Sequence, residues 1–193
     1  IDETKLRPGM DADADDAVRV VIVTGGPGSG KSVIALSLLG ELYRRRRTAE
    51  HATGSKAFTE TLRKVAGARN QRVRELFGYC NQFSHDEPNS LDVLILDEAH
   101  RLRESSNFRF TPKGKRSTKP QVQELLDVAR VPVFLLDEHQ VVRPGEIGTV
   151  AAIREAAQAR GLEVQMVELD AQFRSGGSRL YEEGVLRLLG LVD

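Results

Sequence analysis

The residues most clearly suited to chemistry form a glycine-rich run that ends in a lysine and a serine. The run is Gly25, Gly26, Pro27, Gly28, Ser29, Gly30, Lys31 and Ser32, with the spacing GxxxxGK[ST]. Glycines here let backbone N–H groups converge on phosphate oxygens with no Cβ in the way. The lysine can reach the β- and γ-phosphates of a nucleotide, and the serine hydroxyl can ligate Mg²⁺. The run therefore predicts a binding loop for a nucleoside triphosphate and Mg²⁺.

Two acidic pairs, Asp97-Glu98 and Asp137-Glu138, could complete such a site. Each pair directly follows an apolar run typical of a buried strand. Open α/β sheets bind ligands at the carboxyl ends of their strands, which is where both pairs are expected. An aspartate there can hold the Mg²⁺ shell, and a neighbouring glutamate can activate the attacking water. The residue types alone leave both pairs open as the acidic partner of the loop.

The elements that must position these residues alternate between strand and helix patterns. Strand patterns cover residues 18–23, 49–53, 91–96, 131–136 and 163–169. Helix patterns cover 31–45, 58–66, 72–77, 121–129, a segment to about 160 capped by Thr149, and 178–189. The polar stretches 78–90 and 101–119 are expected to be connections. This alternation predicts an α/β fold, in which helices cover both faces of a mostly parallel sheet in three layers.

Length and composition agree with one folded domain. The 193 residues are enough for one well-buried unit, expected at 18–193, with 1–17 as a flexible lead-in. The 28 basic and 28 acidic side chains cancel, so bulk charge argues neither for nor against a nucleic-acid partner. The single cysteine, Cys80, rules out an intrachain disulfide and fits a reducing, cytoplasmic setting. No apolar run approaches the roughly 18 residues of a membrane helix, so no membrane partner is expected.

Four further strings resemble helicase motifs. The string DEAH at 97–100 resembles motif II of the superfamily 1 and 2 helicases. The string LLDEHQ at 135–140 resembles motif III, although Leu136 stands where that motif has a glycine. ELDAQFRS at 168–175 resembles motif IV, and ATGSKAF at 52–58 resembles motif Ia. Together with the glycine-rich run, these strings resemble the first RecA-like lobe of a superfamily 1 helicase.

Longer blocks narrow the resemblance. TGGPGSGKSVIAL, HATGSKAFTETLRK, FTPKGKRSTKPQV and FLLDEHQVVRPGE are similar to bacterial helicase-like ATPases related to the helicase part of Schlafen proteins. The similarity extends over residues 18–190. It implies a P-loop NTPase that uses ATP, or another NTP, with Mg²⁺.

The resemblance also assigns roles to individual residues. Ser32 and Asp97 would hold Mg²⁺, and Glu98 would be the general base. Lys31 and Gln140 would contact the phosphates, with Gln140 coupling loss of the γ-phosphate to the nucleic-acid side. Arg174 would supply charge to the transferring phosphoryl group, as an arginine finger does. His100 would link Glu98 to the loop of motif III.

Contact with nucleic acid is expected at two places. By resemblance to motif Ia, Thr53, Ser55 and Lys56 would hold the backbone phosphates of single-stranded DNA or RNA. The connection 101–119 contains seven basic residues and one acidic residue, and Phe108 and Phe110 lie among them. This composition suits base stacking, and it suits a solvated flexible loop equally well.

The function implied is the ATP-binding and hydrolysing lobe of a superfamily 1-like DNA/RNA helicase or translocase. A second lobe is expected in the full-length protein and not in this chain, so the fragment alone should be weakly active or inactive. One alternative is a nucleotide-gated switch or interaction ATPase that does not move along a strand. Another is a small-molecule kinase of the P-loop type.

Overall fold

The computed structural model describes residues 19–66, 68, 70–108, 111–138, 140 and 144–169. The lead-in expected at 1–17, the helix expected at 178–189 and Arg174 lie outside the described residues.

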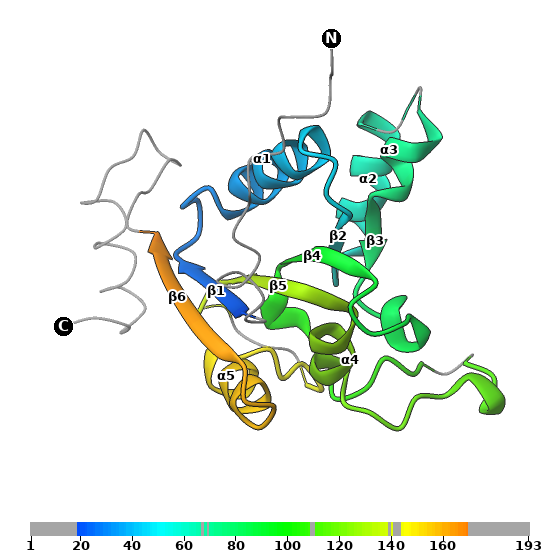
Figure 1. The fold of residues 1–193 in the computed structure, drawn as a ribbon, viewed down its shortest axis with the longest axis vertical. Helices are drawn as coiled ribbons and strands as arrows, with labels where there is room; N and C mark the ends of the chain where they lie inside the picture. Colours follow the sequence, from blue (N-terminus) through cyan, green and yellow to red (C-terminus); the bar gives the residue numbers. More distant parts are fainter. Residues whose placement is uncertain are drawn as a thin grey trace, which may run out of the picture.

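Six strands of the described chain form one sheet, and every neighbouring pair is parallel (Figure 1). The strands are β1 (Arg19–Gly25), β2 (Ala49–Thr53), β3 (Phe77–Tyr79), β4 (Leu91–Asp97), β5 (Ala129–Leu136) and β6 (Glu163–Leu169). Their order across the sheet is β3-β2-β4-β5-β1-β6. The predicted α/β class with a parallel sheet is therefore confirmed.

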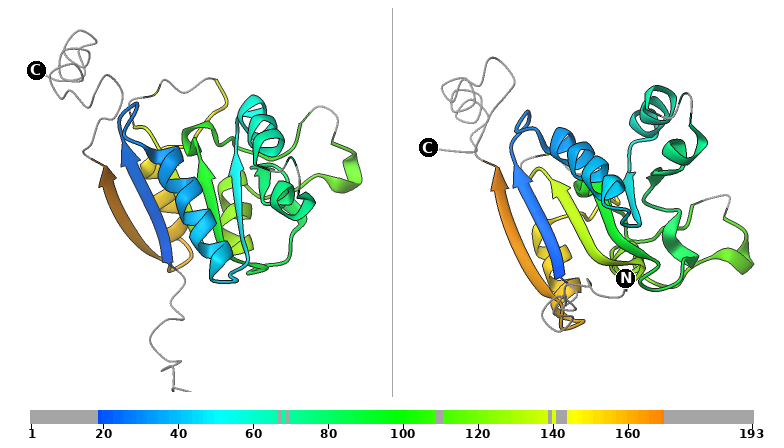
Figure 2. Two further views of the ribbon diagram at one scale, coloured as in Figure 1. Left: turned by 90° about the horizontal axis from the view of Figure 1, so that it is seen from above. Right: turned by 45° about the horizontal axis from the view of Figure 1, so that its top comes forward.

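Helices cover both faces of the sheet, which gives three layers (Figures 1 and 2). One face carries α1 (Lys31–Arg44), α2 (Lys56–Val65) and α3 (Gln71–Glu75). The other carries α4 (Gln121–Val128) and α5 (Val150–Gln158). The connections that the structure describes contain three short 3₁₀ turns, namely η1 (Phe83–His85), η2 (Ala99–Arg101) and η3 (Lys113–Lys115).

Alternation along the strands explains why both faces are covered. In β1, Ile22 packs in the core beneath α4 and α5, whereas Val23 packs in the core beneath α1. Successive side chains of a strand point to opposite faces, so a strand that is apolar at consecutive positions must be buried on both sides. The central strand β4 has this character, because Leu94, Ile95 and Leu96 are all fully buried.

Most expected elements are confirmed near their predicted bounds, and the main error concerns β3. The sequence predicts a connection from residue 78 to 90, but Phe77–Tyr79 is an edge strand paired with β2. Three residues are too short to show a period, so the pairing depends on the neighbouring strand. The N-cap prediction for α5 is confirmed, since the Thr149 hydroxyl accepts a hydrogen bond from the Ala152 N–H at 3.1 Å.

Strand order decides which loops meet. Strand β5 lies between β1 and β4, and β2 lies on the other side of β4. Because all strands are parallel, the glycine-rich loop after β1 shares one edge of the sheet with Asp97, Asp137 and Thr53. The predicted functional residues from four separate segments are therefore gathered at this edge. Within the described part of the chain, no helix is long and apolar enough to cross a membrane.

Candidate active site

The glycine-rich loop has a backbone that requires glycine. Gly28 and Gly30 have positive φ angles of 85° and 88°, in the left-handed region that side chains disfavour. The Ser29 N–H donates to the Gly26 carbonyl oxygen at 3.2 Å and closes the turn. A Cβ added to Gly25 would lie 2.6 Å from the Ser29 hydroxyl oxygen. The loop is therefore tightly wound, with its backbone accessible for close approach of a ligand.

Helix α1 begins directly after this loop in a way that favours an anion. Gly30 occupies the N-cap position, no side chain caps the helix, and its first turn has no acidic residue. The first N–H groups of a helix lack intrahelical partners and lie at the positive end of the helix dipole. The start of α1 is therefore suited to a phosphate group.

Lys31 is buried, and its ammonium group is folded onto the loop. It donates hydrogen bonds to the Gly25 oxygen at 2.6 Å, the Gly26 oxygen at 2.9 Å and the Ser29 hydroxyl at 3.3 Å. These contacts place the positive charge inside the curve of the loop. From there it can turn to the oxygens of a bound phosphate.

Asp97, at the end of β4, converges with Ser32 of the loop. Its carboxylate is 1% exposed, and Oδ1 accepts from the Glu98 N–H at 3.0 Å. Burial acts to raise the pKa of Asp97, but His51, the Ser32 hydroxyl and the Glu98 N–H together hold that pKa below its usual value. The two residues predicted to hold Mg²⁺ therefore lie together, which favours Asp97 in the choice that the sequence left open.

The donors present fit a magnesium–nucleotide complex. The Oδ2 atom of Asp97 is buried with no hydrogen-bond partner in the described structure, and His51 Nε2 lies 3.6 Å from it. A buried carboxylate oxygen in this state is costly, and a hydrated cation would satisfy it. The described residues contain no group of three or more His, Cys, Asp or Glu side chains that could hold a metal alone. Phosphate oxygens and water would therefore complete the shell around Ser32 and Asp97.

Glu98 has a strained backbone conformation, and its carboxylate lies beside His100 and Arg101. Its φ of 57° and ψ of 41° are left-handed, which costs a non-glycine residue on the order of 1 kcal/mol. Its Oε2 atom lies 3.2 Å from His100 Nε2 and 3.3 Å from Arg101 Nε. The His100 contact outweighs burial and, with the charge of Arg101, lowers the pKa of Glu98 below its ordinary value. Glu98 is thus an anchored carboxylate beside Asp97.

His100 connects this carboxylate to the loop after β5. The histidine is buried and lines a cavity of about 250 Å³ together with Asp137, Glu138, Gln140 and Thr149. His100 therefore contacts Glu98 and also borders the cavity that contains Gln140. The link that the resemblance implies between Glu98 and the motif III loop stays a prediction, and His100 is the residue placed to make it. Asp137, the other acidic candidate, lies in this cavity.

Gly148 is a site residue that the sequence analysis missed. A Cβ on Gly148 would lie 1.8 Å from the carbonyl oxygen of Ala99. Beside it, the Ile147 N–H donates to the Leu102 oxygen at 2.7 Å, and residues 103 and 146 form an antiparallel bridge. The segment before α5 is thus fixed against the turn that follows Asp97 and Glu98. The only sequence signal was a glycine directly before the helix cap.

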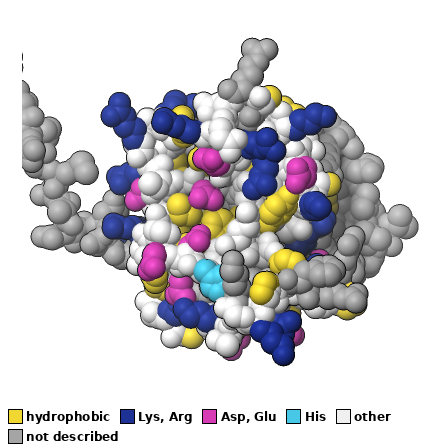
Figure 3. Space-filling model, turned by 90° about the vertical axis from the view of Figure 1, so that its right-hand side faces the viewer, with side chains coloured by type: hydrophobic (Ala, Val, Ile, Leu, Met, Phe, Trp, Pro, Cys, Tyr) yellow, Lys and Arg dark blue, Asp and Glu magenta, His cyan; other side chains and the backbone are white. Residues whose placement is uncertain are grey.

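A larger cavity of about 620 Å³ lies between α2, β3, η2 and the segment that follows η2, and Arg101, which contacts Glu98, is among its lining residues. We call it the basic groove. Its lining includes Lys56, Arg63, Arg101 and Arg103, the aromatic side chains of Tyr79 and Phe108, and the acidic Glu60 and Glu146. Figure 3 views the molecule from the side that carries α2, α3 and β3, where Lys and Arg side chains are interspersed with acidic and apolar ones.

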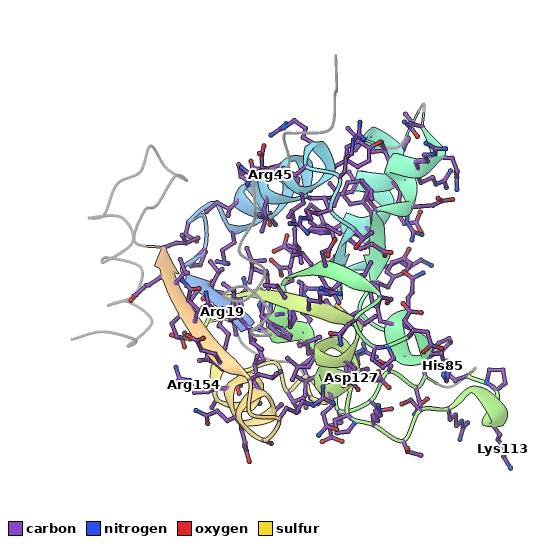
Figure 4. The ribbon with its side chains drawn as sticks, viewed as in Figure 1. Arg19, Arg45, His85, Lys113, Asp127 and Arg154 are labelled. Atoms are coloured by element: carbon purple, nitrogen blue, oxygen red, sulfur yellow. The ribbon has the colours of Figure 1, made fainter. Side chains whose placement is uncertain are left out.

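The residues predicted to bind nucleic acid lie in different positions relative to this groove. Lys56 lines it at the start of α2, whereas Ser55 is the N-cap residue of that helix. Thr53 also borders the groove but is fully buried, and its hydroxyl accepts from the Ser55 N–H at 3.2 Å. Lys113, from the basic connection, lies at the tip of a loop far from α1 (Figure 4). Arg109 and Phe110 lie outside the described residues.

Comparisons with known proteins agree with this picture of the chain. The family model "Schlafen group 3, DNA/RNA helicase domain" matches residues 18–191. A comparison with curated proteins gives no match.

A comparison with solved structures gives matches of low identity, three of which are the following. A DNA replication initiation factor is 15% identical over 90% of this chain and 55% of its own, with a TM-score of 0.38. DnaA from Aquifex aeolicus bound to AMPPCP is 17% identical over 91% of this chain and 47% of its own, with a TM-score of 0.38. The Hef helicase domain from Pyrococcus furiosus is 14% identical over 81% of this chain and 36% of its own, with a TM-score of 0.41.

This chain spans about half the length of the first of these proteins. At such identities and scores, the likeness adds nothing to what the sheet itself shows about the fold. The match to the family model does identify a family, because it extends over nearly all of the sequence. The chain belongs to the Schlafen group 3 DNA/RNA helicase domain family.

Proposed function

We propose that this chain is the ATP-binding and hydrolysing lobe of a superfamily 1-like DNA/RNA helicase or translocase. The observation that supports it best is the convergence of Ser32, after the glycine-rich loop, with Asp97 at the end of β4. Two segments far apart in sequence thereby place a hydroxyl and a buried carboxylate together at the start of α1. Glu98 follows directly and can face a water molecule there.

Each residue has a separate task in this proposal. Lys31 turns from the loop carbonyls to the β- and γ-phosphates, and Ser32 and Asp97 hold the cation. Bound Mg²⁺·ATP supplies the phosphoanhydride bond to be broken and a cation that offsets its charge. Glu98 accepts the proton of the attacking water at its carboxylate. Gln140 reports the state of the γ-phosphate through the cavity that it shares with His100.

The remaining parts of the proposal concern the whole protein. Residues 18–193 would form the first RecA-like lobe, and a second lobe in the full-length protein would close over the nucleotide. Arg174 would act from the border of the two lobes. The isolated lobe would then bind nucleotide weakly and hydrolyse it slowly. A cytoplasmic location belongs to the same proposal.

Single-stranded DNA or RNA is the proposed polymer, bound in the basic groove. Its cationic side chains suit phosphates, and exposed Phe108 suits stacking on a base. In this arrangement Ser55 and Lys56 contact the backbone of the strand, and buried Thr53 shapes the turn that presents them.

Two substitutions in the full-length protein test the nucleotide site. Lys31→Ala should abolish binding of a fluorescent ATP analogue, because the buried charge inside the loop is lost. Glu98→Gln should leave binding intact and lower the hydrolysis rate by roughly 100-fold or more, as expected for loss of a general base. Equal loss of binding in both variants would contradict the assigned roles.

The same assay, with and without single-stranded DNA and RNA, tests the polymer. Hydrolysis should increase when a strand is added, and the protein should displace an annealed strand. If ATP is hydrolysed but single strands neither bind nor stimulate, the chain is a nucleotide-gated switch instead.

A further inference from the structure

Arg101 lies between the candidate general base and the basic groove. It belongs to η2, one turn after Glu98, and its backbone N–H donates to the Glu98 carbonyl oxygen at 2.9 Å. Its Nε atom is 3.3 Å from Glu98 Oε2, and its side chain is 35% exposed. The same side chain also lines the basic groove. One residue thus contacts both Glu98 and the space proposed for the strand.

The stem of Arg101 is fixed against the loop that leads into α2. A Cβ added to Gly54 would lie 2.9 Å from Arg101 Cβ and 3.6 Å from Arg101 Cδ. Gly54 stands between Thr53 and Ser55, so Arg101 packs against the turn that resembles motif Ia. With its stem held there, the guanidinium group can exchange partners without movement of the backbone.

The charges of the groove favour such an exchange. Arg63 is already engaged, since its Nε donates to the Phe77 oxygen at 2.7 Å and its guanidinium lies 5.0 Å from the centroid of the Tyr79 ring. A phosphodiester in the groove would meet Lys56 and Arg103 together with Arg101. A guanidinium has five N–H donors in a planar fork and binds phosphate through two of them at once.

We propose that Arg101 couples the groove to Glu98. Without a strand it holds Glu98 Oε2 in an ion pair, and a phosphodiester of a bound single strand draws the guanidinium into the groove and releases the carboxylate toward the attacking water. This inference rests on the proposed function, because it requires both an ATPase site and a strand in the groove.

Burial explains why this contact, and not the one with His100, is the one that changes. The Arg101–Glu98 pair is partly exposed on both sides, and such pairs are weak. The His100 side chain is only 4% exposed and is enclosed beside the Gln140 cavity. On release of Arg101, Glu98 keeps its contact with His100 and loses the one on the side of the groove. The strand therefore changes the position of Glu98 without disturbing its link to the motif III loop.

The test is Arg101→Gln in the full-length protein, since glutamine keeps most of the stem that packs on Gly54. Phosphate release is measured at saturating Mg²⁺·ATP, without a strand and with saturating oligo(dT) or oligo(U). The hydrolysis rate without a strand should rise roughly fivefold. This is the factor expected when the free energy of a weak, partly exposed ion pair no longer holds Glu98 away from the attacking water. The stimulation by either strand should shrink toward a ratio of one. Binding of the fluorescent ATP analogue should not change.

Two further variants separate this coupling from a general loss of structure. Arg101→Lys keeps a positive charge beside Glu98 and should restore a low strand-free rate. Arg154→Ala removes an exposed arginine from α5 (Figure 4) and should leave both the strand-free rate and the stimulation unchanged. The melting temperature of each variant confirms that it is folded.

The outcomes are distinguishable. An unchanged strand-free rate in Arg101→Gln, or an unchanged stimulation ratio, overturns the coupling. If Arg101→Gln does not fold, Arg101→Lys provides the test. A stimulation ratio and a dependence on strand concentration equal to those of the unsubstituted protein would then contradict a specific exchange between arginine and phosphate. If the unsubstituted protein neither hydrolyses ATP nor responds to strands, it is the proposed function that has failed.

Discussion

Gly148→Ala is the substitution for which the structure makes the sharpest prediction. The added Cβ would lie 1.8 Å from the Ala99 carbonyl oxygen and 2.8 Å from the carbonyl carbon atoms of Ala99 and His100. All three atoms belong to backbone, so no rotation of a side chain can relieve the overlap. Contacts of a Cβ below 3.0 Å are essentially never seen, so one of the two segments must move by about 1 Å.

The magnitude follows from two contributions. Overpacking of this kind typically costs about 1–3 kcal/mol. Separating the segments also weakens the hydrogen bond from Ile147 to Leu102, at 2.7 Å, which contributes about 1 kcal/mol. We therefore expect the free energy of unfolding to fall by about 3 kcal/mol. Because the displaced turn holds Glu98 and His100, hydrolysis should fall more steeply than nucleotide binding.

The assay is chemical denaturation of the variant, together with nucleotide binding and phosphate release. Gly40→Ala is the matched control, since a Cβ at Gly40 meets nothing within 4 Å in the middle of α1. There the same chemical change should stabilise the protein by about 0.5–1 kcal/mol, because alanine favours the helix. If Gly148→Ala unfolds at the same denaturant concentration as the unsubstituted protein and keeps its hydrolysis rate, then Gly148 does not pack closely against the Ala99 carbonyl group and the prediction is refuted.

Two further predictions concern stability away from the loop. Thr149→Ala removes the side-chain cap of α5 and should lower the free energy of unfolding by about 1 kcal/mol, measured by denaturation, whereas Thr149→Ser should retain the cap. Asp127 contacts Arg160 and Lys119, and although burial raises its pKa, these partners hold that pKa below the ordinary value. The stability from this group is therefore complete above the unfolded-state pKa, near 4, and is lost as the pH falls through the lower folded-state pKa. Asp127→Asn should lower the free energy of unfolding at pH 7 by about 1 kcal/mol. It should also reduce the decrease in that free energy between pH 6 and pH 3. If the variant loses as much stability over this pH range as the unsubstituted protein, the ion pairs of Asp127 do not contribute as expected.

The sequence by itself determined the features whose physics is local. The glycine-rich loop needs only the eight residues from Gly25 to Ser32, because its turns, the helix start and the lysine all lie within one stretch. Strands β2 and β6 begin and end at the predicted residues. In β6 the apolar residues Val164, Met166 and Leu169 are interspersed with polar ones, and Gly161 ends the preceding helix pattern. The Thr149 cap is equally local, because the cap and the N–H that it accepts from lie three residues apart.

Tertiary structure decided everything that depends on which strands become neighbours. The residue types offered two acidic pairs of nearly the same form, and only the folded chain shows Asp97 beside Ser32 and Asp137 in the cavity that contains Gln140. Helix α1 crosses the sheet over β4 as well as β5, since its residues Ala35 and Leu39 share one core with Ile95 and Val133. The edge strand β3 exists because β2 offers it hydrogen bonds. The contacts of Gly148 with Ala99, and of Arg101 with Gly54, join segments 49 and 47 residues apart along the chain. Such contacts produce no periodic pattern of residues in the sequence, because the two surfaces that pack together exist only after the sheet has formed.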